Sequence, residues 1–150
     1  TLHEAWNDKQ IEEIRNNSSL TVSSIGVLRY ANLTLLSEDY ETEEFYTNGD
    51  FILDLEVENL NITANGFSNF FLTGSAIKAN IALYSGNSRV EAADFLIQDL
   101  IVFHRSTNKI IVNPQMSIIG EIRSLGDVIS KNEPPLIDVT EYYTGRLIFN

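Results

Sequence analysis

The chain has 150 residues, a net charge of −11 and no cysteine. This length predicts a single domain over residues 1–150, and the charge argues against nucleic acids and anionic membrane surfaces as partners, because both are polyanions. The lack of cysteine excludes disulfides, thiol catalysis and thiolate metal sites.

The first third of the chain predicts one helix, one strand and an acidic loop. Apolar residues recur near one helical face over residues 2–14, and residues 16–19 end this predicted helix. Imperfect alternation over residues 20–36 predicts a strand, and residues 37–49 follow as an acidic loop. Nine acids and no Lys or Arg lie between Tyr30 and Ile77. This segment indicates a solvated acidic face, a cation site or a site for a basic partner.

Residues 49–68, GDFILDLEVENLNITANGFS, carry the clearest pattern. Phe51, Leu53, Leu55 and Val57 share one side of an alternation whose other side holds Asp54, Glu56 and Glu58, which predicts a half-buried strand whose acidic face meets solvent. The apolar phase shifts by one residue at Leu60, as a β-bulge would produce. We therefore expect one long, bent strand with a curved apolar face that packs on a core or lines a cavity.

The rest of the chain predicts further strands and a second helix. Residues 77–83 alternate, and residues 89–104 are apolar on both faces, which predicts a strand covered on both sides. Helical spacing predicts a helix over residues 118–130, and residues 142–149 read as a last strand. We find no internal repeat. Because the loops are short, the predicted fold class is α+β, a long, bent antiparallel β-meander wrapped on one or two helices.

No catalytic or metal-binding motif is present. We expect His3 and His104 to be surface residues, and nothing near either one indicates a triad. Asp54, Glu56 and Glu58 share one strand face at a spacing of about 7 Å, which is more typical of a solvated edge than of an acid/base pair. We therefore expect no enzyme activity, no catalytic residue, no metal, and no cofactor beyond a bound lipid or pigment.

Several features predict a secreted, extracellular glycoprotein. Sequons of the form N-x-S/T begin at Asn16, Asn17, Asn32 and Asn61, and we expect glycans at Asn17, Asn32 and Asn61. The chain starts at Thr1 without Met, as a processed secretory protein would. No apolar run approaches the ~18 residues that span a bilayer.

Residues 49–70 resemble part of the insect takeout and juvenile-hormone-binding family and of the related mite group 7 allergens. In that family a glycine precedes an alternating strand, then N-[LV]-x-[IV] and another glycine. The residues that match are Gly49, Leu53, Leu55, Val57, Asn59, Leu60, Ile62, Gly66 and Phe67. The resemblance implies a tubular lipid-binding fold, of which this chain would be a fragment. The family's usual amino-terminal disulfide has no counterpart here.

The pattern and the resemblance together predict a secreted carrier that binds an elongated apolar ligand, such as a lipid, a terpenoid or a carotenoid-like pigment, in a sheet-lined cavity. Its partner would be an apolar small molecule, and the oligomeric state stays open. The alternative is a non-enzymatic structural or interaction protein, such as a coat or matrix subunit, with a solid core. A glycan-active enzyme ranks last. The residues expected to line the cavity are Phe51, Leu53, Leu55, Val57, Phe67, Phe70, Ile81, Leu83, Phe95 and Ile97.

Overall fold

The computed structural model describes residues 2–5, 11–15, 21–37 and 49–150, and these residues form ten β-strands and no helix. All ten strands belong to one sheet. The strands are β1 (Leu2–Ala5), β2 (Ile11–Arg15), β3 (Val22–Ser37), β4 (Phe51–Ala64), β5 (Asn69–Leu83), β6 (Arg89–His104), β7 (Ile110–Ile122), β8 (Val128–Ser130), β9 (Leu136–Glu141) and β10 (Leu147–Phe149).

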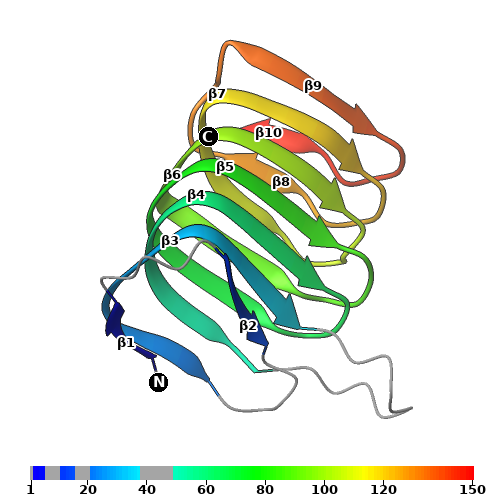
Figure 1. Ribbon diagram of the computed structural model, residues 1–150. Coiled ribbons are helices and arrows are strands. Elements are labelled where there is room, and N and C mark those ends of the chain that lie inside the picture. Colours follow the sequence, from blue (N-terminus) through cyan, green and yellow to red (C-terminus); the bar gives the residue numbers. More distant parts are fainter. Residues whose placement is uncertain (1, 6–10, 16–20, 38–48) are drawn as a thin grey trace.

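The strands stack as successive coils of a β-solenoid (Figure 1). Phe51 of β4 pairs with Phe70 of β5, which pairs with Val90 of β6 and then with Ile110 of β7, and every pair is parallel. Successive partners lie 19 or 20 residues apart along the chain. Each coil therefore adds one layer about 4.8 Å from the last. β1 and β3 lie at one end of the stack, and β9 at the other (Figure 1).

The predicted α+β fold with an antiparallel meander is wrong. The short connections between strands suggested hairpins. Each long strand bends, however, so that it forms most of one coil and ends near the edge of the sheet where it began. A short turn can then join two parallel strands, because the strand itself supplies the crossover. Residues 89–104 are also not covered on both sides, since Leu96 and Ile101 of β6 point outward and are exposed.

Both predicted helices are absent from the described residues. In place of the helix over residues 2–14, β1 and β2 each pair in parallel with β3, while residues 6–10 lie outside the described residues. In place of the helix over residues 118–130 the structure has the end of β7, a turn and β8. Ile118 and Ile122 are four residues apart, a spacing that suits one face of a strand as well as one face of a helix. Both are buried, whereas Leu125 lies exposed in the turn.

The phase shift at Leu60 is a corner of the coil and not a β-bulge. Val57 and Leu60 are buried, with exposed Glu58 and half-buried Asn59 between them, and the pairing of β4 with β5 continues across this point without a register shift. The same spacing of buried residues recurs in the next two coils, at Ala76 and Ala79 and at Ile97 and Leu100. The chain therefore has an internal repeat, contrary to our expectation.

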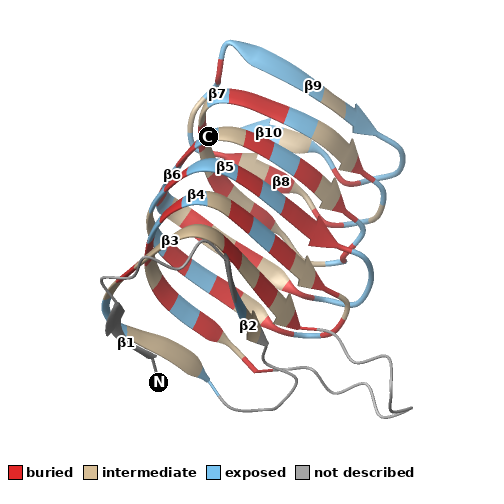
Figure 2. Cartoon of the chain, viewed as in Figure 1, coloured by how far each residue is buried: buried red, intermediate tan, exposed pale blue. Residues whose placement is uncertain are grey.

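Buried residues recur along successive strands (Figure 2), and their apolar side chains fill the interior as columns. The rings of Phe51 and Phe70 stack with centroids 4.8 Å apart and planes 8° apart, which matches the distance between neighbouring strands. Val90 and Ile110 continue this column, and all four side chains are fully buried. Burial of each such side chain contributes about 1.5–3 kcal/mol to folding, so the repeated columns hold the coils together.

His104 is part of this core, although the sequence placed it at the surface. It pairs with Leu83 on one side and with Ile122 on the other, and it is fully buried. Neither ring nitrogen has a partner with good hydrogen-bond geometry. Burial lowers the pKa of His104 from 6.5 to about 4, and the nearby backbone of Asn108 and Asp127 and the Asp127 charge oppose this shift only in part.

We expect acid to destabilise the protein through His104. Between pH 6.5 and about 4 the unfolded chain takes up a proton at this ring and the folded chain does not, so stability is lost as the pH falls through this window. The loss attributable to His104 is at most about 3 kcal/mol. Urea unfolding of wild type and His104→Leu at pH 7 and pH 4.5 measures it.

The variant should lose less stability than wild type between these two pH values, since leucine matches the apolar column and cannot titrate. Carboxylates that titrate in the same range affect both proteins equally, so the difference between the proteins isolates His104. An equal loss in both proteins would show that this ring is protonated in the folded state.

Candidate binding groove on the solenoid face

Most residues predicted to line a ligand cavity are packed in the solid core. Nine of the ten are buried, while the tenth, Phe67, lies in a turn and is 51% exposed. The buried nine are Phe51, Leu53, Leu55, Val57, Phe70, Ile81, Leu83, Phe95 and Ile97. Direct stacking such as that of Phe51 on Phe70 fills the space where a tubular ligand would lie. The predicted carrier function is therefore wrong, and the alternative of a non-enzymatic interaction protein with a solid core agrees better with this interior.

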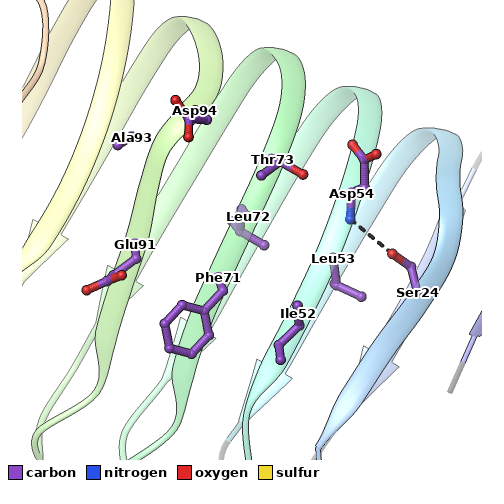
Figure 3. Close-up of a pocket in the computed structure, with 10 residues that line it drawn as sticks. All are labelled: Ser24, Ile52, Leu53, Asp54, Phe71, Leu72, Thr73, Glu91, Ala93 and Asp94. Carbon is purple, nitrogen blue, oxygen red and sulfur yellow. Dashed lines mark hydrogen bonds between the residues drawn. The ribbon is translucent and has the colours of Figure 1, made fainter.

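A groove on the outer surface, which brings exposed apolar side chains beside carboxylates, is the candidate site (Figure 3). It has a volume of about 370 Å³ and crosses four successive strands, β3 to β6. Its lining residues are Ser24, Ile52, Leu53, Asp54, Phe71, Leu72, Thr73, Glu91, Ala93 and Asp94.

Two rows of side chains, each running across the strands, form the groove (Figure 3). Ile52, Phe71 and Glu91 occupy paired positions on β4, β5 and β6 and make the first row. The two apolar members of this row stay accessible, with Ile52 50% and Phe71 36% exposed. The groove thus offers an apolar strip to a partner.

Asp54, Thr73 and Asp94 make the second row, at the bend of the coil. The backbone N–H of Asp54 donates to Ser24 Oγ at 3.0 Å, which ties β4 to β3 at this bend. Two strand spacings separate the two aspartates, about 10 Å, so they act as separate negative charges. Among the residues that the structure describes, no cluster of acids and histidines could hold a metal ion.

The other acids singled out in the sequence lie elsewhere on the same strand. Glu56 accepts from Arg29 Nε at 2.9 Å on the exposed face, and Glu58 is exposed beyond it. Glu91, at the edge of the groove, pairs with Arg89. Of the carboxylates that line the groove, Asp54 and Asp94 therefore have no ion-pair partner among the residues that the structure describes.

The three predicted glycosylation sites occupy different settings. Asn17 and most of the acidic loop, residues 38–48, lie outside the described residues. Asn32 Oδ1 accepts a hydrogen bond from Asn59 Nδ2 at 3.0 Å on the neighbouring strand, whereas Asn61 is exposed on β4. Glycosylation at these positions stays a prediction.

The sequence reasoning missed the groove because its residues come from different coils. Ile52, Phe71 and Glu91 share a row only because the coil repeats about every 20 residues. The turns carry a trace of this repeat, since residues 64–68 read ANGFS and residues 84–88 read YSGNS. In the structure these turns stack, with Asn87 N–H donating to Gly66 O at 2.9 Å.

Comparison with known proteins gives one family. A model of the family described as "Putative auto-transporter adhesin, head GIN domain" matches residues 7–134, which is most of the chain. The chain belongs to this family. The resemblance to the takeout and juvenile-hormone-binding family is therefore wrong, and its bulged strand motif arises from the corner of a solenoid coil.

Membership of the GIN-domain family indicates a surface or extracellular location, because the family is described by the head domain of an auto-transporter adhesin. Neither a curated protein nor a solved structure matched the chain. In the described part of the chain, no helix is long and apolar enough to cross a membrane.

Proposed function

We propose that this chain is the head of an exported adhesin, which binds its partners through the outward side chains of a rigid solenoid and catalyses no reaction. The observation that carries the proposal is the family match over residues 7–134. The solid core supports it, because a stack of fully buried columns leaves only outer faces for recognition. Secretion follows from the same role, since an adhesin contacts its target outside the cell.

The groove is the face that we assign to partner contact. A strip of exposed apolar side chains beside Asp54 and Asp94 suits a polypeptide segment that carries an apolar residue next to Lys or Arg. The apolar contact would supply affinity, and the carboxylates would select for positive charge. The overall charge of −11 would speed the encounter with a basic partner.

Adhesion is tested with fluorescent beads that carry the purified protein. We expect cells of the source organism, or the surfaces they colonise, to retain these beads better than beads coated with albumin. Phe71→Ser should lower retention at least about fivefold if the groove makes the contact. Ile77→Ser is the matched control, because Ile77 is exposed on the same strand but lies outside the groove. Retention of wild-type beads no better than that of albumin beads would remove the adhesive function.

Secretion is tested separately on intact cells. Protease added outside the cells should digest the protein while a cytosolic marker stays whole. Protection of the protein until the cells are lysed would place it inside and would contradict export.

A further inference from the structure

A separate row of side chains, away from the groove, runs along the edge of the solenoid where the turns stack. Four positions at the ends of successive strands pair with one another in turn: Leu83, His104, Ile122 and Glu141. The residues of the row are the ones that directly follow these positions, namely Tyr84, Arg105, Arg123 and Tyr142. Their backbone N–H groups donate to carbonyls of the preceding coil at 2.8 to 2.9 Å. The four residues therefore occupy equivalent places on consecutive coils, about 4.8 Å apart.

Ring contacts join three of these side chains, Tyr84, Arg123 and Tyr142, to one another through Phe103, while Arg105 takes its place in the row between Tyr84 and Arg123 from the strand pairing alone. The Arg123 guanidinium carbon lies 4.1 Å from the centroid of the Tyr142 ring and 5.9 Å from that of Phe103. The Tyr84 and Phe103 rings are 5.4 Å apart and tilted by 44°. Such cation–π and tilted aromatic contacts hold the side chains in fixed places. We call this surface, formed by Tyr84, Phe103, Arg105, Arg123 and Tyr142, the turn ridge.

The turn ridge is accessible and carries positive charge on an acidic protein. Tyr84 is 45% and Tyr142 is 53% exposed. Arg105 is exposed, and within the described residues no carboxylate pairs with it, whereas Arg123 Nε donates to Glu121 at 2.5 Å.

Charge is unevenly distributed along the sequence. Residues 1–99 hold sixteen Asp and Glu and five Lys and Arg, whereas residues 100–150 hold five of each kind. The whole net charge of −11 thus belongs to the first part. The stretch that supplies Phe103, Arg105, Arg123 and Tyr142 therefore carries no net charge to repel an anion, and the Arg105 guanidinium has no carboxylate partner within the described residues.

We propose that the turn ridge binds an acidic polysaccharide, a chain whose sugars carry carboxylate or sulfate groups. The planar guanidinium of Arg105 can donate two parallel hydrogen bonds to either anion. The exposed faces of Tyr84 and Tyr142 can pack on the apolar faces of sugar rings on both sides of it. A polymer with groups at regular intervals fits a row whose side chains repeat with the coil. This assignment rests on the proposed adhesive function and adds a ligand class at a second surface.

Polygalacturonate is the probe, and its binding to the immobilised full chain is measured by biolayer interferometry at low and high salt. We expect binding that weakens with salt and falls about tenfold in Arg105→Gln, since a hydrogen-bonded charge pair is lost. Lys131→Gln is the matched control: it removes one positive charge from an exposed residue outside the ridge, and its binding should equal that of wild type. Fully methyl-esterified polygalacturonate, which has no charge, should bind far more weakly.

Each of the following results would overturn the assignment: no binding of polygalacturonate, equal losses in the Arg105 and Lys131 variants, or equal binding of the esterified polymer. Sulfated dextran in a parallel arm shows whether sulfate replaces carboxylate. Polyglutamate that competes as well as polygalacturonate would also overturn it, in favour of an acidic polypeptide. If wild-type beads adhere to cells but polygalacturonate does not bind, only the ridge assignment fails, whereas loss of both removes the adhesive function as well.

Discussion

Gly120→Ala should strongly destabilise the protein, although it adds only one methyl group. Gly120 lies in β7 with φ at +144°, a backbone region that residues with a side chain rarely adopt. A Cβ built there would lie 1.8 Å from the carbonyl oxygen of Val102 on the neighbouring strand. Because that atom belongs to the backbone, relief requires the two coils to separate. We expect a loss of at least about 3 kcal/mol in the free energy of unfolding.

Urea unfolding followed by circular dichroism measures this loss. Ile119→Ala is the control, because Ile119 is the preceding residue of the same strand and points outward, 38% exposed. It should cost below about 1 kcal/mol. If Gly120→Ala unfolds at the same urea concentration as wild type, the close approach of β6 and β7 at this point is contradicted.

Leu55→Ala should cost about 2–5 kcal/mol, as expected for a leucine truncated in a packed core. Leu55 is fully buried and pairs with Leu28 of β3 and Gly74 of β5 in successive coils. The truncation removes contacts and leaves a cavity that the flanking coils cannot close, since their spacing is fixed by backbone hydrogen bonds. The same unfolding experiment measures it, and Ile77→Ala on the exposed face of β5 is the control.

The size of the Leu55 effect also distinguishes a solid core from a tunnel. A loss below about 1 kcal/mol would mean that Leu55 borders empty space or a replaceable ligand, which would contradict the packed interior. An effect in the expected range together with a small effect at Ile77 would support the columns.

The sequence predicts the faces of individual strands well. Phe51, Leu53, Leu55 and Val57 are buried as expected, and Glu56 is exposed. This success has a physical basis, because alternation in a strand reports directly which side chains leave water. The alternation does not report which strand lies alongside or in which direction that strand runs, however. It could therefore not distinguish parallel coils from an antiparallel meander.

The site was harder to predict for the same reason. Asp54 and Asp94 are forty residues apart in sequence and meet in one groove only after two coils have formed. The turn ridge likewise draws Tyr84 and Tyr142 together through the stacking of turns. Either surface can be predicted only once the repeat of about 20 residues is recognised in the sequence. The corners obscure this repeat, because at each corner the alternation of buried and exposed residues shifts by one position.

Distances between spin labels along one column test the parallel solenoid most directly. One outward column contains Ile52, Ile111, Ile129 and Ile148. Counted from Ile52, Ile111 is three strands away, Ile129 four and Ile148 five. Because the chain has no native cysteine, pairs of cysteines introduced at these positions take nitroxide labels cleanly. The backbones at Ile111, Ile129 and Ile148 lie about 14, 19 and 24 Å from that at Ile52, so the nitroxide distances measured by pulsed electron paramagnetic resonance should rise by about 4.8 Å from each pair to the next. Distances that do not rise in even steps with strand number would contradict the stacked coils, and with them the lateral binding surfaces proposed for this protein.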